Sequence, residues 1–183
     1  MSRSILILFA HPAYQRSRAQ RRLVRVARDL EGVTFHDLYE TYPDFDVDVK
    51  REQALLEAHD DVVLQHPFYW YSTPPLVKQW MDLVLEYGWA YGPGGTALAG
   101  KRFLCAITAG GGAESYDAEG SNRFTVRELL VPLEQTVRLC RMEFLPPFVV
   151  YGTHVMDDAG FTQAASAYRE RLTALRDATD EDA

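Results

Sequence analysis

The chain of 183 residues has the length of one ordinary domain, which is enough to bury a sizeable hydrophobic core. Hydrophobic residues make up 47% and charged residues 25%, as in soluble globular proteins, and the net charge of −7 argues against nucleic acid as the main partner. Two cysteines make no disulfide framework and suit a reducing cytosol. The apolar run at residues 5–10 is too short for a membrane span, and an arginine-rich segment follows it instead of a cleavage site. The sequence therefore predicts a cytoplasmic protein.

Five segments are predicted as strands, and the first of them is a short apolar run without alternation, typical of a strand covered on both faces. Four strands are expected at residues 4–10, 33–39, 61–67 and 102–109, and a fifth within residues 144–153. Amphipathic or proline-started segments between them predict helices. The helices are expected at residues 17–30, 48–58, 74–88, 123–139 and 158–177. Gly32 is expected to end the first helix, and Pro132 to bend the fourth.

The alternation of strands and helices predicts an α/β fold, in which helices cover both faces of an open, mostly parallel sheet. With five strands, the expected order is 2-1-3-4-5, as in a flavodoxin-like three-layer sandwich. One domain is expected to span residues 1–183, with a disordered acidic tail at about 178–183. Ligands of such sheets bind beyond the carboxyl ends of the strands, where the strand order reverses between strands 1 and 3.

The loop after the first strand, HPAYQRSRAQ, carries groups that bind phosphate. Ser17 is a candidate N-cap, and the N-terminus of the helix that it begins attracts anions. His11 can donate a hydrogen bond, and arginines at positions 16, 18, 21 and 22 raise the local positive charge. The alternative is that Ser17 only caps the helix and the arginines form a solvated face.

Four consecutive aromatic residues, Phe68, Tyr69, Trp70 and Tyr71, follow the third strand. Rings in a row suit neither a strand nor a helix, because both elements distribute successive side chains over different faces. On a loop, the rings can wall a pocket for a flat ligand, where stacking contributes on the order of 1 kcal/mol beyond burial. The alternative is that Phe68 and Trp70 are core residues beneath the loop.

A glycine-rich loop follows the fourth strand and begins with Thr108, Ala109, Gly110 and Gly111. Glycine lets the backbone approach a flat ligand closely, although a plain flexible turn is the alternative. The loop after the first strand contains no glycine, so the chain lacks the dinucleotide-binding fingerprint G-x-G-x-x-G and the P-loop. The five histidines lack the spacing of metal ligands, and no metal site is predicted.

Several segments together resemble the flavodoxin-fold NAD(P)H:quinone oxidoreductases, and among them the ancillary flavoproteins of glutathione-gated potassium efflux systems. The segments, within residues 4–155, are ILILFAHP, S-x-x-Q at 17–20, LYETYPDFDVD, QHPFYWYSTPPLVKQWMDLVL, GWAYGPGGTALAGK, TAGGG and LPPFVVYG. The resemblance implies a bound flavin, which is FMN in the potassium-efflux branch and FAD in the mammalian-type quinone reductases. The absence of a C-terminal extension that could hold adenosine favours FMN.

The resemblance also implies roles for individual residues. It places His11, Ser17, Arg18, Ala19 and Gln20 around the phosphate, and the aromatic and glycine-rich loops around the isoalloxazine ring. Gln20 is a departure, because the phosphate motif of relatives usually ends in asparagine.

Two further residues are implied at the active site. Tyr116 matches a tyrosine that lines the active site of quinone reductases. Asn122 stands where some relatives have a histidine paired with that tyrosine. Asparagine cannot take up a proton as imidazole does, although it can still donate a hydrogen bond.

The activity that the resemblance implies is a two-step hydride transfer by a homodimer, from NAD(P)H to flavin N5 and then to a quinone. One alternative is a regulatory subunit that docks on a potassium–proton efflux antiporter, at the inner face of the membrane. A second is a general azo- or nitroreductase. A third is a flavodoxin-type one-electron carrier, which would need no nicotinamide site.

Overall fold

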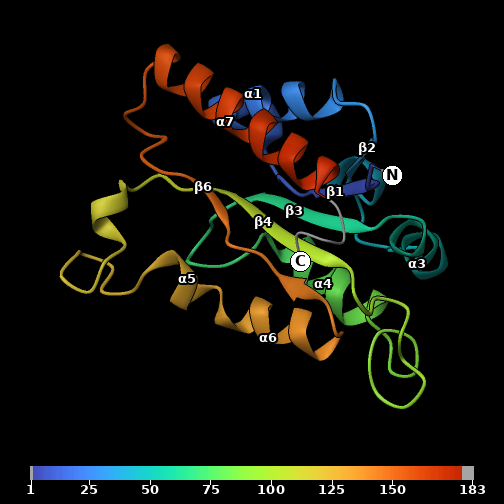
Figure 1. The fold of residues 1–183 in the computed structure, drawn as a ribbon. Coiled ribbons are helices and arrows are strands. Elements are labelled where there is room, and N and C mark those ends of the chain that lie inside the picture. Colours follow the sequence, from blue (N-terminus) through green and yellow to red (C-terminus); the bar gives the residue numbers. More distant parts are fainter. Residues whose placement is uncertain (1, 179–183) are drawn as a thin grey trace.

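The computed structural model describes residues 2–178 and shows a parallel sheet between two layers of helices (Figure 1). The main path of the sheet is β2-β1-β3-β4-β5, and β6 also pairs with β4. The strands are β1 (Ile5–Phe9), β2 (Val33–Asp37), β3 (Asp61–Pro67), β4 (Arg102–Thr108), β5 (Glu143–Phe144) and β6 (Phe148–Val150). The predicted α/β class and the strand order are confirmed.

The segment predicted as a fifth strand forms two short strands instead of one. β5 and β6 pair with successive parts of β4, and Pro146 and Pro147 lie between them. Proline has no backbone N–H to donate, so the ladder of hydrogen bonds is interrupted at this pair. The segment 144–153, predicted to hold a fifth strand, contributes to two short ones.

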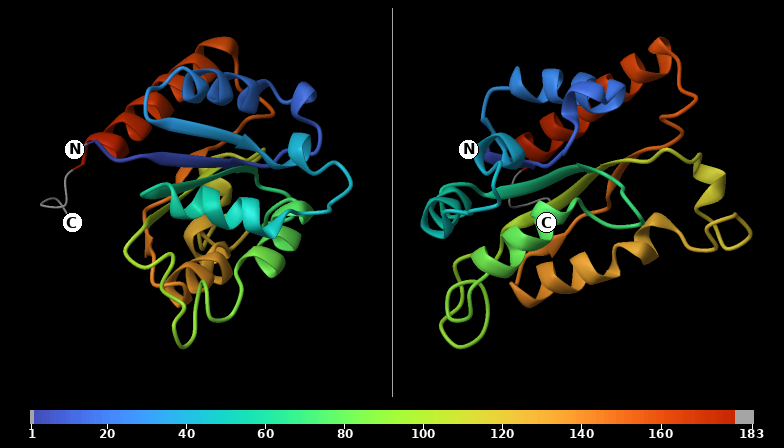
Figure 2. Two further views of the ribbon diagram at one scale, coloured as in Figure 1. Left: turned by 90° about the vertical axis from the view of Figure 1, so that its right-hand side faces the viewer. Right: turned by 180° about the vertical axis from the view of Figure 1, so that it is seen from behind.

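Helices cover both faces of the sheet, as predicted (Figures 1 and 2). On one face lie α1 (Arg18–Arg28) and α7 (Asp158–Asp177). On the other face lie α3 (Val49–Glu57), α4 (Pro75–Val84) and α6 (Val131–Leu139). Short elements complete the described chain, namely α2 (Leu38–Thr41), α5 (Val126–Leu129) and the 3₁₀ turns η1 (Tyr14–Arg16) and η2 (Ala113–Ser115).

Three predicted helix boundaries are corrected by the structure. α1 ends at Arg28, and Gly32 instead adopts a left-handed φ of 79° in the turn to β2. α4 ends at Val84, before residue 88. The helix predicted at 123–139 is divided at Leu130, because Pro132 cannot donate the hydrogen bond that would continue α5 into α6.

The central strands separate two hydrophobic cores, because side chains alternate between the faces of a strand. On β1, Ile5 and Ile7 face α1 and α7, whereas Leu6 and Leu8 face the opposite layer. All four side chains are fully buried, as expected of a strand covered on both faces. This frame fixes the positions of the loops at the carboxyl ends of β1, β3 and β4.

A buried carboxylate links α3 to the neighbouring elements on the α4 side. Glu52 accepts hydrogen bonds from His36 Nε2 at 2.8 Å, the Tyr42 hydroxyl at 2.6 Å and Trp80 Nε1 at 2.8 Å. Burial by itself raises the pKa of Glu52, but the hydrogen bonds from these three side chains bring the pKa below its usual value. Glu52 is therefore an ionised acceptor at neutral pH.

Three further predictions concern the ends of the chain and its relation to a membrane. No helix within residues 2–178 is long and apolar enough to cross a bilayer. The predicted acidic tail lies, apart from Ala178, outside the described residues. The extent of the single domain, residues 1–183, stays a prediction.

Candidate functional site

A cleft of about 690 Å³ opens where the loops after β1, β3 and β4 meet. This is the edge of the sheet that the strand order predicted, and the volume suits a ligand of cofactor size. Many of the predicted binding residues line the cleft together. They are His11, Ser17, Arg18, Ala19, Phe68, Tyr69, Trp70, Thr108 and Gly110.

His11 lines this cleft and carries a hydrogen-bond donor. Its Nδ1 accepts a hydrogen bond from the backbone N–H of Ala13 at 3.0 Å, so the ring hydrogen lies on Nε2. Burial lowers the pKa of His11, which keeps the imidazole neutral near pH 7. Tyr69 packs edge-on against the ring, with 5.9 Å between the ring centroids. The imidazole is thus neutral, fixed in orientation, and able to donate a hydrogen bond from Nε2.

The N-terminus of α1 lies beside His11. Ser17 Oγ accepts a hydrogen bond from the backbone N–H of Gln20 at 3.1 Å, which confirms Ser17 as the N-cap. The N–H groups of Arg18 and Ala19, in the first turn, have no partner within the helix and attract an anion. The Arg18 guanidinium points elsewhere, because it pairs with Asp158 at 3.1 Å and lies over the Phe161 ring.

The four aromatic residues form a tight hairpin beside the cleft. Tyr69 and Ser72 exchange backbone hydrogen bonds, and Trp70 and Tyr71 between them have φ values of 50° and 62°. Two left-handed residues define a type I′ turn, which glycine and asparagine prefer. Bulky residues there carry strain, and such strain is concentrated at functional sites.

The four rings of the hairpin differ in their exposure to solvent. Trp70 is 92% exposed at the tip, whereas Phe68 is buried beneath it. Tyr69 and Tyr71 are partly exposed. Of the two residues that could have been core residues beneath the loop, only Phe68 is one. Trp70 is exposed to solvent and lines the cleft.

Gly110 forms part of the cleft wall and is in close contact with an unpredicted residue. A Cβ atom at Gly110 would lie 2.5 Å from Cε1 of His154, so a larger residue here would displace the exposed His154 ring. Thr153 and His154 both line the cleft. They follow β6, whose carboxyl end lies at the same edge of the sheet. Neither was predicted as a site residue, because the sequence carries no motif at this position.

Gln20 and Ala109 are fully buried and do not line the cleft. Gln20 Nε2 donates to Thr108 Oγ1 at 3.0 Å, so this side chain contacts a cleft residue from behind. The Gln20 side chain therefore lies behind the cleft wall, and its place around a phosphate stays a prediction.

The other predicted residues form an aromatic cluster beside the cleft. The Phe68 ring lies 6.1 Å from that of Tyr116, which lies 5.6 Å from that of Tyr151. The Tyr71 hydroxyl donates to Asn122 Oδ1 at 3.1 Å. Burial, and then the nearby Tyr71, raise the pKa of Tyr116, so its hydroxyl stays protonated. Gly111 backs this cluster, since its Cβ position lies 3.4 Å from Tyr116.

Comparisons with known proteins agree with this arrangement. The sequence profile of the flavodoxin-like fold family matches residues 3–172. The chain belongs to this family. The glutathione-regulated potassium-efflux system ancillary protein KefF from Klebsiella aerogenes is 48% identical over 168 residues, which are 92% of this chain and 94% of KefF. The resemblance drawn from the sequence is thereby confirmed.

Several solved structures share the fold. A general stress protein 14 from Treponema denticola in complex with FMN is 38% identical, with a TM-score of 0.89 over 94% of this chain and 99% of that one. An NADPH-quinone reductase from P. pentosaceus is 32% identical, with a TM-score of 0.84 over 92% and 96%. A thermophilic tryptophan halogenase from Streptomycin violaceusniger is 44% identical, with a TM-score of 0.90 over 91% and 97%.

Proposed function

We propose that the chain is a flavin-dependent NAD(P)H:quinone oxidoreductase that binds FMN in this cleft. The observation that carries the proposal is one cleft lined both by the N-terminal turn of α1 and by the aromatic hairpin with its exposed Trp70 ring. A phosphate fits the first, and a flat ring fits the second. The structure of the Treponema denticola relative in complex with FMN supports FMN over FAD.

The residues of this chain would bind and orient the cofactor and the substrate. A bound flavin supplies the two-electron chemistry between a nicotinamide and a quinone. His11 and the first turn of α1 would hold its phosphate, and Tyr69, Trp70, Thr108 and Gly110 its ring. Tyr116 keeps its proton, so it can donate a hydrogen bond to a quinone oxygen as negative charge develops there.

Asn122 can serve the same task. Its Oδ1 accepts from Tyr71, which leaves the amide N–H₂ group free to donate to a substrate. We propose that Asn122 acts as a hydrogen-bond donor where some relatives have a histidine. It takes up no proton, so the reaction would draw its proton from solvent.

An absorbance spectrum of the purified protein tests the proposal most directly. We expect the visible bands of an oxidised flavin, which anaerobic NADPH bleaches and a quinone restores. Failure to bind either FMN or FAD after reconstitution would contradict the proposal. A stable one-electron semiquinone with no reaction toward NADPH would instead indicate a flavodoxin-type carrier.

The range of acceptors separates the quinone reductase from a general reductase. Steady-state rates for quinones, azo dyes and nitroaromatics would rank these classes, and we expect the highest kcat/KM for quinones. Because one similar structure carries the name of a tryptophan halogenase, tryptophan with halide belongs in the same panel. We expect no halogenated product from it.

A regulatory role is the second candidate function, and the 48% identity to KefF favours it. In that role the protein would work at the cytoplasmic side of the membrane and dock on a potassium efflux antiporter. Potassium efflux from cells that express the antiporter, with and without this protein, tests it. Equal efflux in both would exclude the role.

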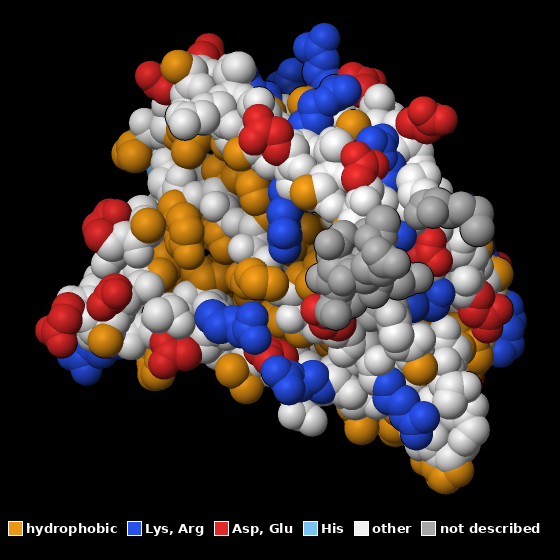
Figure 3. All heavy atoms as spheres, viewed as in Figure 1, with side chains coloured by type: hydrophobic (Ala, Val, Ile, Leu, Met, Phe, Trp, Pro, Cys, Tyr) orange, Lys and Arg blue, Asp and Glu red, His pale blue; other side chains and the backbone are white. Residues whose placement is uncertain are grey.

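We also propose that the protein is a homodimer. Figure 3 shows hydrophobic side chains gathered between α7 and α5, on the face that carries the edge strand β6. Phe148 and Val149 on β6, and Tyr151 directly after it, are only partly buried. An apolar edge of this kind suits a protein interface. Sedimentation equilibrium is expected to give twice the chain mass, and a monomer would contradict the proposal.

Replacing His11 with phenylalanine is expected to weaken FMN binding by about 10-fold, because a hydrogen bond to a phosphate is lost. Riboflavin, which lacks the phosphate, should bind the variant as it binds the wild type. Fluorescence titration of the apoprotein with both compounds measures this. His59→Phe is the control, since His59 contacts Leu55 and Thr34 away from the cleft. An equal loss for both compounds would place His11 at the ring instead.

A further inference from the structure

A chain of three hydrogen bonds crosses the interior from α7 to the cleft. The Tyr168 hydroxyl donates to Gln65 Oε1 at 2.9 Å, and Gln65 Nε2 donates to Gln20 Oε1 at 2.7 Å. Gln20 Nε2 then donates to Thr108 Oγ1 at 3.0 Å. Tyr168, Gln65 and Gln20 have no solvent-exposed surface, and Thr108 alone reaches the cleft.

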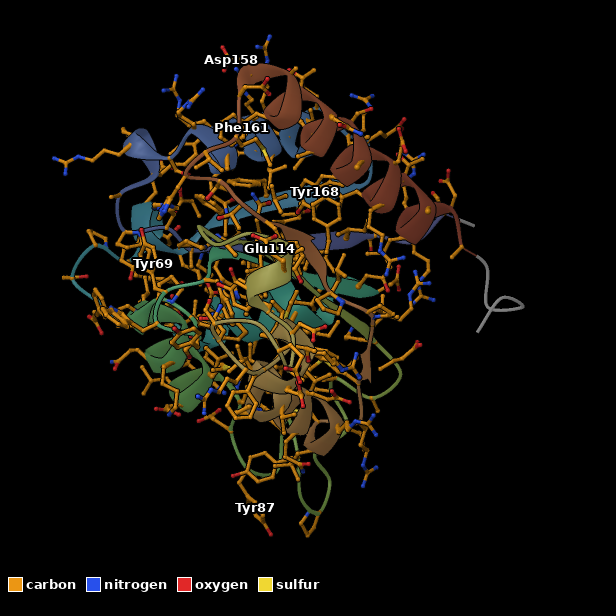
Figure 4. The ribbon with its side chains drawn as sticks, turned by 90° about the vertical axis from the view of Figure 1, so that its left-hand side faces the viewer. Tyr69, Tyr87, Glu114, Asp158, Phe161 and Tyr168 are labelled. Atoms are coloured by element: carbon orange, nitrogen blue, oxygen red, sulfur yellow. The ribbon has the colours of Figure 1, made fainter. Side chains whose placement is uncertain are left out.

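The fold brings these residues together on one face of the sheet. Gln65 and Thr108 lie on the adjacent strands β3 and β4 and face the same layer as Val63 and Ala106, which pack against α1 and α7. Gln20 belongs to the first turn of α1. Figure 4 shows Tyr168 on α7 with its ring directed toward the sheet. The Tyr168 ring is held by Phe148, at 5.1 Å between centroids.

The buried phenol at the far end fixes the direction of the chain. An amide side chain can turn over, and the two glutamines could in principle point the opposite way. In that orientation Gln65 would donate to Tyr168, and the phenol hydrogen would be left without an acceptor among the described residues. A buried unsatisfied donor is costly, and burial raises the pKa of Tyr168, so the phenol keeps its hydrogen.

The direction of the chain decides what Thr108 offers to a ligand. Because Gln20 donates to Thr108 Oγ1, the hydrogen of the Thr108 hydroxyl takes no part in this hydrogen bond and remains available to another acceptor. No other acceptor within residues 2–178 takes it, and Thr108 lines the cleft. We propose that Tyr168, Gln65 and Gln20 are positioning residues whose one-directional hydrogen bonds turn the Thr108 hydroxyl into a donor for an acceptor atom of the bound flavin ring. The ligand class rests on the proposed function, whereas the direction of the chain does not.

The direction can be measured without any flavin. In the isotope-labelled apoprotein, we expect a scalar coupling across the hydrogen bond from Gln65 Nε2 to Gln20 Cδ. A coupling from Gln20 Nε2 to Gln65 Cδ would show the reverse direction and overturn the inference. Should the wild type bind no flavin, the proposed function fails while this measurement still decides the direction.

The effect on binding is tested with a double-mutant cycle. Tyr168→Phe removes only the phenol oxygen, so the glutamines can turn over and Thr108 can donate to Gln20 instead. FMN binding is expected to weaken by about fivefold, as for one lost hydrogen bond. In a Thr108→Val background, Tyr168→Phe should change the FMN Kd by less than about twofold, because the donor is already absent.

A matched control separates this effect from general destabilisation. Tyr42→Phe also removes a buried hydroxyl with one hydrogen bond, to Glu52, and it should leave the FMN Kd unchanged. An equal effect of Tyr168→Phe in both backgrounds would mean that it acts through stability, and no effect in either would mean that the direction is irrelevant. Both results overturn the inference.

Discussion

Replacing Glu52 with glutamine is expected to lower the free energy of unfolding by about 3 kcal/mol, although the side chain hardly changes in size. The two carboxylate oxygens accept from three buried donors, on His36, Tyr42 and Trp80. A glutamine amide offers one oxygen, so at least one donor faces the amide N–H₂ group and loses its acceptor. Urea unfolding at pH 7, followed by tryptophan fluorescence and circular dichroism, measures the change.

The neighbouring Glu57 provides the matched control on the same helix. Glu57 Oε1 accepts from Trp89 Nε1 at 2.7 Å, which is the same kind of contact at the exposed surface. Glu57→Gln is expected to cost less than about 0.5 kcal/mol, because water replaces the lost interaction. Equal losses for the two variants would show that burial does not amplify the contact of Glu52.

The effect of Glu52 should also depend on pH. The folded-state pKa is below the unfolded value, so the carboxylate contributes stability that is present above the unfolded pKa. This contribution is lost as the pH falls through the folded pKa. The difference in stability between the wild type and Glu52→Gln is therefore expected to shrink toward acidic pH. A constant difference from pH 7 to pH 3 would contradict this assignment.

The position of the site could be predicted because it depends on features that sequence records directly. β1 and β3 read as buried strands, and parallel strands place their carboxyl ends at one edge of the sheet. The residues that follow them, from His11 and from Phe68 onward, therefore had to lie together. Ser17 could also be placed, since a serine before an amphipathic segment is a local capping signal.

The conformation of the hairpin at Trp70 and Tyr71 could not be predicted in this way. Local preference assigns left-handed positions to glycine or asparagine, and the chain has two bulky aromatics there. The surrounding structure imposes the turn, through Tyr69, Ser72 and the buried Phe68. Such a conflict between local preference and tertiary structure is expected at functional sites.

The role of Gln20 was hidden for a different reason. The family resemblance implied that Gln20 lies around a phosphate, but helix spacing does not tell which side chain points inward. The partner that fixes its orientation is Gln65, which in turn is fixed by Tyr168, 103 residues further along the chain. Only the packing of α7 against α1 brings these residues together.

Replacing Gly120 with alanine is expected to lower kcat/KM for quinones by about 100-fold, since displacing catalytic groups by 1 Å can have this effect. The loop that carries Tyr116 and Asn122 is closed by the hydrogen bond from Asn122 N–H to Ser115 O at 3.0 Å. A Cβ atom at Gly120 would overlap the backbone carbonyl oxygens of Glu114 and Ser115. Backbone cannot turn aside as a side chain can, so the loop must open and move both residues.

The loss should be confined to the substrate side of the site. Gly120 lies outside the cleft that we assign to FMN, so the flavin spectrum and the FMN Kd are expected to match those of the wild type. Glu119→Ala, an exposed change in the same loop, should retain full activity. Full activity of Gly120→Ala would show that Tyr116 and Asn122 do not contact the quinone. A loss of FMN binding together with activity would show that the loop belongs to the cofactor site. Activity is lost whether Tyr116 and Asn122 contact the quinone or the FMN, so the affinity for FMN is the measurement that separates these two locations.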